Sequence, residues 1–152
     1  MPNQACPVPD TGFGMTKYMS NCLFCKIIAG EIPCYKVYED DYALAFLDIH
    51  PCSQGHTVVI PKKHITNIEK AELADWQNLS EALKKTADKV QSVVKPDGMN
   101  VGLNNNPVAG QAVPHLHWHI IPRYEGDGGG SMHSIVRNAG DLKVEDVAEL
   151  FR

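Results

Sequence analysis

Residues 113–123 place three histidines at alternate positions, separated by large apolar side chains and followed by a proline. An alternation with a period of two predicts a β-strand with one buried face. The histidines then share one face, about 6.5–7 Å between neighbours, and the apolar residues face the core. Pro122 predicts the end of the strand. The histidines are His115, His117 and His119, and the apolar residues between and after them are Leu116, Trp118 and Ile120.

Three imidazoles on one strand face are difficult to explain by packing alone. Each ring is partly charged near neutral pH, so crowding the three together costs stability. A pattern with this cost indicates that the histidines serve a function. Two kinds of chemistry remain open. The histidines could bind a metal, since imidazole is a ligand for zinc, copper, iron and nickel. Alternatively, one of them is a nucleophile and its neighbours handle protons and a bound anion.

Length and composition set the broad class. The chain has 152 residues, which suits one domain with a sizeable core. We assign residues 1–20, rich in proline and glycine, to an N-terminal extension and residues 21–152 to a single domain. A net charge of −4 argues against a general nucleic-acid binder, and no apolar run approaches the length of a membrane span. Five cysteines, an odd number, favour a reducing compartment, so we expect a cytoplasmic protein.

Strand patterns dominate, with one long helical pattern between the third and fourth strands. From residue 71 to 94, apolar residues recur every three or four positions, which predicts an amphipathic helix. Short helices are expected at 26–30 and 144–151, and the glycine-rich stretch 125–131 is expected to be flexible, as a lid or a linker. The fold class is therefore α+β, an antiparallel sheet of about five strands with one long helix and short terminal helices. The expected strands are 35–38, 42–49, 56–60, 99–103 and the histidine strand.

Two further segments carry polar chemistry. Cys22 and Cys25 form a Cys-x-x-Cys pair, which fits half of a tetrahedral zinc site, a redox dithiol or two unrelated buried cysteines. A polar loop from Asn104 to Gln111 leads into the histidine strand. Its backbone N–H groups and amide side chains are suited to hold anionic oxygens.

The histidines permit phosphorus chemistry. An imidazole with a pKa near 6.5 is largely unprotonated at pH 7 and can attack a phosphorus ester or anhydride. The middle histidine, His117, is best placed to attack and would form a phosphoramidate that water then hydrolyses. A neighbouring histidine can donate a proton to the leaving group, while backbone N–H groups and Gln111 can stabilise charge on the phosphate oxygens.

Residues 115–121 resemble the H-φ-H-φ-H-φ-φ signature of the histidine-triad (HIT) nucleotide hydrolases and transferases. Residues 46–49, 55–65 and 110–111 also resemble family segments in the same order, so the resemblance covers about residues 21–123. It implies that His117 is the nucleophile, that His119 contacts the phosphate and aids the leaving group, and that His56 lies beside the phosphate. Asp48 would hold the ribose hydroxyls. The nucleoside pocket would be shaped by Phe24, Ile27, Ile32, Phe46 and Ile49, and the phosphate side would be lined by Asn104, Gln111, Ala112 and Val113.

The resemblance also implies a metal and an assembly state. Family members that share the Cys-x-x-Cys bind structural zinc, and the matching ligands here would be Cys22, Cys25, His64 and His115. His115 would then anchor the strand that presents His117. No organic cofactor is expected, and members of this kind are homodimers.

The implied substrate is a purine nucleoside phosphoramidate or related nucleotidyl compound, from which AMP is released. The residues at two positions do not agree on the identity of the leaving group. Ala112 stands where the phosphoramidase branch commonly carries Ser, and Pro122-Arg123 resembles the dinucleoside-polyphosphate hydrolases. The alternatives are such a hydrolase, a nucleotide-binding module that mainly binds a partner, and a three-histidine metalloenzyme.

Overall fold

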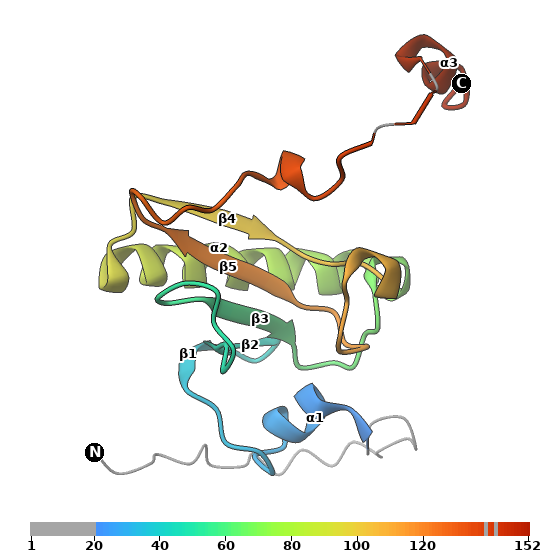
Figure 1. The fold of residues 1–152 in the computed structure, drawn as a ribbon. Coiled ribbons are helices and arrows are strands. Elements are labelled where there is room, and N and C mark those ends of the chain that lie inside the picture. Colours follow the sequence, from blue (N-terminus) through green and yellow to red (C-terminus); the bar gives the residue numbers. More distant parts are fainter. Residues whose placement is uncertain (1–20, 139, 142) are drawn as a thin grey trace.

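The computed structural model describes residues 21–138, 140–141 and 143–152. Five strands form one antiparallel sheet in the order β1-β2-β3-β5-β4 (Figure 1). The strands are β1 (Lys36–Glu39), β2 (Ala43–Leu47), β3 (Thr57–Pro61), β4 (Gly98–Gly102) and β5 (Trp118–Arg123). The α-helices are α1 (Leu23–Ile28), α2 (Leu73–Val94) and α3 (Val144–Glu149), and the 3-10 helices are η2 (Ile68–Lys70), η3 (Pro107–Ala109) and η4 (Met132–Ser134). The predicted α+β class with one long helix is confirmed.

Helix α2 covers one face of the sheet. Its buried residues Leu79, Ala82, Thr86 and Val90 recur at helical spacing, so they form one apolar stripe. This stripe packs on side chains of β2, β3 and β5 and forms the larger core of the described residues. The helix ends where Lys95 adopts a left-handed conformation, with φ of 48°, and Pro96 follows.

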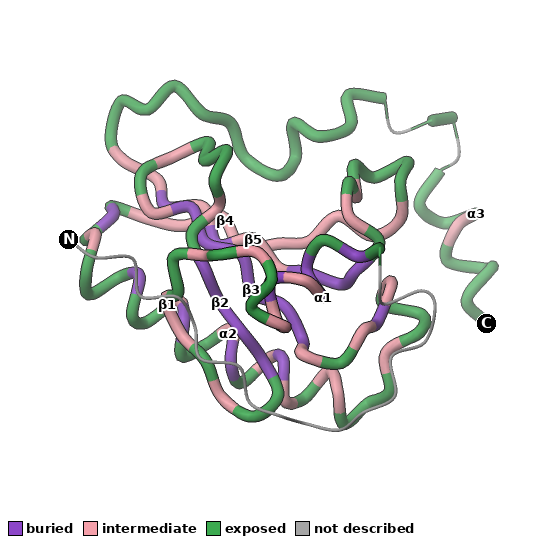
Figure 2. The backbone as a smooth tube through the Cα atoms, turned by 90° about the horizontal axis from the view of Figure 1, so that it is seen from below, coloured by how far each residue is buried: buried purple, intermediate pink, exposed green. Residues whose placement is uncertain are grey.

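Helix α1 covers the opposite face of the sheet. Phe24 and Ile27 of this helix pack against Phe46 of β2 and Val58 of β3. Strands β2 and β3 are therefore buried on both faces, and Figure 2 shows these two strands as the main buried part of the tube. All the candidate site residues that follow lie on or beside this α1 face.

The histidine segment differs from the predicted strand at both ends. Strand β5 begins at Trp118, so only His119 among the three histidines lies on it. His115 N–H donates to Val113 O at 2.8 Å and Leu116 N–H donates to Ile65 O at 2.6 Å, and these bonds bend the approach to β5. Pro122 does not end the strand. It lies opposite Met99 of β4 and beyond Ile120, the last residue of β5 that pairs with β3, so its missing N–H breaks no bond to β3.

The remaining boundaries shift by only a few residues. The β1–β2 hairpin, the long helix and the C-terminal helix are confirmed, while α1 begins at Leu23 because Lys26 N–H already donates to Cys22 O at 3.1 Å. The glycine-rich stretch contains an organised turn, in which the Asp127 carboxylate accepts bonds from Arg123 and from the N–H groups of Tyr124 and Gly129.

The expected extension at residues 1–20 lies outside the described residues. None of the described helices has the length and hydrophobicity needed to cross a membrane.

Candidate active site and metal centre

Two cysteines and two histidines from three separate segments meet on the α1 side of the sheet. Cys22 and Cys25 come from the start of α1, His64 from the segment after β3, and His115 from the approach to β5. Their four potential ligand atoms all lie within 4.8 Å of one another. His115 is completely buried, and both cysteines are nearly so. The structure thus brings together all four residues that the resemblance implied as metal ligands.

The spacing of these atoms fits a tetrahedral zinc ion. Zn–S bonds of about 2.3 Å and Zn–N bonds of about 2.0–2.1 Å place S and N ligands about 3.5 Å apart and two N ligands about 3.3 Å apart. The S···N distances are 3.4 Å for Cys22–His115, 3.2 Å for Cys25–His64 and 3.7 Å for Cys25–His115. The Nδ1 atoms of His64 and His115 are 3.3 Å apart. Donor chemistry and spacing therefore both suit zinc.

The surroundings of His115 also prepare it to bind a metal. Its Nε2 lies 2.9 Å from Pro61 O, so this nitrogen donates its proton to the carbonyl and Nδ1 keeps a free lone pair toward the cysteines. Burial lowers the pKa of His115 to about 4, which keeps the ring neutral at pH 7. Burial, together with the Cys22 thiol, raises the pKa of Cys25 to about 12. A bound cation would favour the thiolate form instead.

His117 is oriented by the metal-ligand segment. Its Nδ1 lies 2.6 Å from His115 O, so Nδ1–H donates to this carbonyl and the Nε2 lone pair is free to react. The side chain is buried, and its ring meets the Phe24 ring in a T-shaped arrangement with a centroid separation of 5.1 Å. Burial lowers the pKa of His117. The structure therefore presents an imidazole whose Nε2 can attack an electrophile.

His56 and His119 form a directly bonded pair beside His117. The backbone N–H of Cys52 lies 3.3 Å from His56 Nδ1 and can only donate, so the proton of neutral His56 belongs on Nε2. His56 Nε2 lies 2.9 Å from His119 Nδ1, so His119 accepts there and carries its own proton on Nε2. The ring centroids of His117 and His119 are 5.0 Å apart, so the two imidazoles are neighbours in the site.

Electrostatics keep the pair neutral. Burial lowers the pKa of His119 to about 4, and the charges of His117 and His56 act in the same direction. Burial also lowers the pKa of His56, while the Asp48 carboxylate, whose Oδ2 is 3.7 Å from His56 Nε2, opposes this shift. Asp48 follows β2 and accepts a bond from His50 N–H at 2.8 Å. It is only partly buried, so it remains accessible to a ligand.

The apolar residues expected around a nucleoside divide into two groups. Four of them belong to one cluster under α1, namely Phe24, Ile27, Ile32 and Phe46, and Val113, which was expected on the phosphate side, packs against the same cluster. Phe24, Ile27 and Phe46 are buried and form an apolar floor, in which the Phe24 ring contacts the rings of His115 and His117. Ile49 is instead 72% exposed and lies at the surface beside Asp48.

The loop between β4 and β5 holds the other expected phosphate ligands. The Asn104 side chain lies against Gly110, because a Cβ added at Gly110 would be 3.5 Å from Asn104 Nδ2. Gly110 itself adopts a φ of +97°. Ala112 is exposed. The Gln111 carboxamide is bonded to Thr66 O, Val113 O and Asn106 N–H, so it is committed to the loop itself.

Sequence reasoning missed the backbone groups that fix the imidazoles. Pro61 O, His115 O and Cys52 N–H determine which nitrogen of His115, His117 and His56 carries the proton. The sequence offered one signal for the Cys52 contact, a glycine at position 55 just before His56. In the structure Gly55 adopts a φ of +88° in a tight loop. A Cβ at Gly55 would lie 2.9 Å from Val94, so only glycine fits this loop against α2.

Comparison with known proteins agrees with this geometry. The family described as HIT domain matches residues 29–126, more than half of the chain. The protein Hit of Bacillus subtilis is 48% identical over 131 residues, which are 86% of this chain and 89% of that protein. The adenosine 5'-monophosphoramidase hnt1 of Schizosaccharomyces pombe is 45% identical over 103 residues, 68% and 74% of the two chains. Adenylylsulfatase HINT3 of Arabidopsis thaliana is 37% identical over 126 residues, 83% and 64% of the two chains.

Solved structures share the same architecture. The crystal structure of a HIT family member from Bacillus subtilis matches with a TM-score of 0.76 at 46% identity, covering 86% of this chain and 92% of that chain. A Zn-bound histidine triad family protein from Mycobacterium smegmatis matches with a TM-score of 0.68 at 33% identity, covering 72% and 80%. Fold and site together define an α+β domain of the histidine-triad type. The chain belongs to the HIT domain family.

Proposed function

We propose that this protein hydrolyses purine nucleoside phosphoramidates or related nucleotidyl compounds and releases AMP. The observation that carries the proposal is the orientation of His117, whose Nδ1–H is bound by His115 O while Nε2 is free. Two related proteins add support. The Schizosaccharomyces pombe relative is named as an adenosine 5'-monophosphoramidase and the Arabidopsis thaliana relative as an adenylylsulfatase. The substrates that these two names imply share an adenylyl group and differ in the leaving group.

The proposed reaction has two displacement steps at phosphorus. In the first, His117 Nε2 forms a bond to phosphorus as the bond to the leaving group breaks. His119 enters this step as the imidazolium, which the phosphate anion of a bound substrate favours, gives its Nε2–H proton to the leaving atom and becomes neutral. In the second, water attacks the same phosphorus, His119 takes the water proton, and the P–N bond to His117 breaks to release AMP. His56 orients the His119 ring for both steps through the 2.9 Å contact between His56 Nε2 and His119 Nδ1.

The other candidate residues bind and orient. Asp48 would accept bonds from the ribose hydroxyls, and the apolar floor of Phe24, Ile27 and Phe46 would contact the nucleoside. Cys22, Cys25, His64 and His115 are the residues that would hold a structural zinc, whose coordination supplies a cross-link between three segments.

The test is turnover of an adenosine phosphoramidate by purified protein and by His117→Ala. We expect the wild type to release AMP and the variant to lose turnover by at least about 10³-fold while still binding AMP, because no other side chain can replace the attacking nitrogen. A dinucleoside polyphosphate is assayed in parallel, since Pro122-Arg123 favours this second candidate substrate. Substantial turnover by His117→Ala would refute the mechanism.

A further inference from the structure

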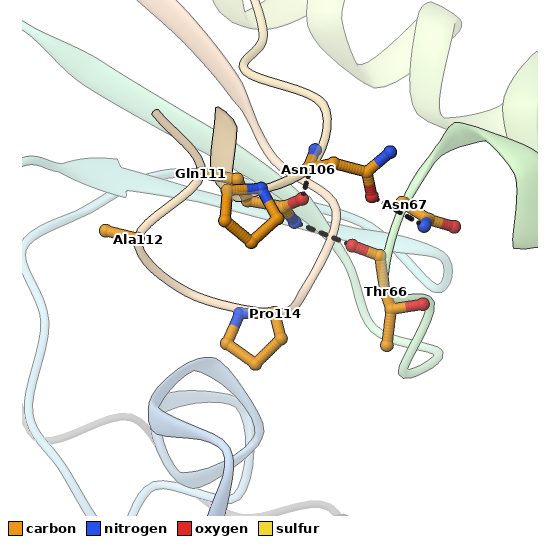
Figure 3. A pocket seen from close by; sticks show the side chains of 7 residues that line it. Thr66, Asn67, Asn106, Gln111, Ala112 and Pro114 are labelled. Atoms are coloured by element: carbon orange, nitrogen blue, oxygen red, sulfur yellow. Dashed lines mark hydrogen bonds between the residues drawn. The ribbon is translucent and has the colours of Figure 1, made fainter. Parts of the chain in front are cut away.

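The loop between β4 and β5 is tied by side chains to the segment that follows the metal ligand His64. Gln111 Nε2–H donates to Thr66 O at 2.6 Å and Asn67 Nδ2–H donates to Asn106 Oδ1 at 2.9 Å. Asn105 adds a third connection, because its Oδ1 accepts Ile68 N–H at 2.9 Å. We call these bonds between residues 66–68 and 105–111 the clasp. Figure 3 shows that Gln111 points from the loop directly toward Thr66.

Gln111 is the central residue of the clasp because it bonds in three directions. Besides Thr66 O, its Nε2 donates to Val113 O at 3.1 Å, and its Oε1 accepts Asn106 N–H at 2.8 Å. Asn106 has a φ of 70°, a left-handed conformation that residues other than glycine rarely adopt. One carboxamide therefore fixes both ends of the turn that contains η3.

The two segments that the clasp joins are separated by a cavity. A cavity of about 260 Å³ lies between the two segments, lined by residues from both (Figure 3). Its lining residues are Thr66, Asn67, Asn106, Pro107, Gln111, Ala112 and Pro114. The clasp bonds therefore join the two segments across a space that side chains do not fill.

The loop held in this way offers free backbone donors a few positions before His117 in the chain. Within the part of the chain that the structure describes, the backbone N–H groups of Ala112 and Val113 donate to no protein acceptor. Val113 packs in the cluster that contains Phe24, and Phe24 contacts His117. Adjacent unpaired N–H groups are a common way to bind phosphate oxygens.

We propose that Gln111 is a positioning residue for nucleotide binding, which holds the loop so that the N–H groups of Ala112 and Val113 face the phosphate. This inference rests on the proposed function and adds a residue that touches neither substrate nor metal. His117 and His119 are oriented by other bonds, from His115 O and from His56, so the loss of Gln111 affects binding more than chemistry.

The experiment compares Gln111→Met, which keeps the side-chain length but removes all three bonds, with wild type. We expect KM for the adenosine phosphoramidate and the Kd for AMP by calorimetry to rise about tenfold, while kcat falls less than about threefold. Thr66→Val is the matched control, because Gln111 bonds to the Thr66 carbonyl and not to its side chain. This control should match the wild type in KM and Kd.

A second variant separates positioning from folding. Gln111→Glu keeps the acceptor for Asn106 N–H but turns a carboxylate oxygen toward the carbonyls of Thr66 and Val113, so KM should rise more than in Gln111→Met. Zinc content and melting temperature are measured for each variant. Unchanged KM and Kd in both variants would overturn the inference, and so would equal losses of kcat and affinity that follow a loss of zinc or of melting temperature. Failure of the proposed function is distinct, because the wild type itself would then release no AMP.

Discussion

At the scale of single residues, backbone groups determine what each imidazole can do. Pro61 O turns the Nδ1 lone pair of His115 toward the cysteines, and His115 O turns the Nε2 lone pair of His117 toward the site. The N–H of Cys52 leaves His56 to donate to His119. These backbone groups thus distinguish the three roles that we propose for neighbouring histidines, metal ligand, nucleophile and proton donor, without any difference in side-chain type.

The proton on His119 predicts a dependence on the leaving group. An amine or alkoxide that leaves poorly needs a proton in the transition state, whereas a good leaving group departs without one. We therefore expect His119→Ala to lose at least about tenfold more kcat/KM on a poor leaving group than on a good one. A series of adenylyl substrates of graded leaving-group pKa measures this, and an equal loss across the series would exclude His119 as the donor.

The same residue predicts a pH effect on stability. Burial lowers the pKa of folded His119 to about 4, against about 6.5 in the unfolded chain. The unfolded state therefore binds more protons between these values, so this stability is present above pH 6.5 and is lost as the pH falls toward 4. The charged or titratable groups facing His119 are His56, His117 and Asp48. We expect urea titrations of the zinc-saturated protein to show a smaller acid loss for His119→Asn than for wild type, and identical pH profiles would contradict this.

At the scale of elements, sequence periodicity predicted the sheet, the long helix and the hairpin, because each has one face or both faces in a core. It failed at residues 113–117. Alternation predicts which residues face the same side, but it contains no information on the bond from Leu116 N–H to Ile65 O that bends this segment. The candidate site residues were predicted through the family resemblance and the Cys-x-x-Cys, and the structure brings the four predicted metal ligands together. The bond from Gln111 to Thr66 O could not be predicted, since its acceptor lies 45 positions away in the sequence.

Helix α1 predicts the effect of metal removal. It has only six residues, too few for a helix to be stable on its own, and it carries both cysteines at its first turn. We expect about one zinc per chain and a fall in Tm of roughly 10 °C on chelation or in Cys22→Ala, because zinc-binding energy is folding energy. Cys52→Ala, outside the cluster, is the control and should keep its zinc. Metal analysis that finds no zinc in protein purified without chelator would contradict this prediction.

At the scale of the whole molecule, residues 135–138 and helix α3 lie away from the sheet (Figure 1). Several large apolar side chains there are exposed, including Ile135 at 71%, Val136 at 70% and Phe151 at 87%. Strand β4 forms an edge of the sheet, since β5 is its only partner among the described strands. Exposed apolar surface of this kind is typical of an interface, and we propose that it joins two copies of the chain.

Sedimentation at micromolar concentration checks this proposal. We expect the mass of a dimer for the wild type and a shift toward monomer for the double variant Ile135→Asp, Val136→Asp, because buried carboxylates would destabilise the interface. A surface substitution on α2, Lys84→Ala, is the control. A wild type that sediments as a monomer at all concentrations would refute the assembly.

The central claim is that phosphorus becomes bonded to His117 during turnover, and acid quench within the first turnovers tests it most directly. With substrate labelled in the adenylyl group, we expect labelled AMP on the protein, mapping to the peptide that contains His117 and absent from His117→Ala. Label on any other residue, or a wild type that turns over without trapping label when the second step is rate-limiting, would contradict the nucleophilic mechanism and favour direct attack by water.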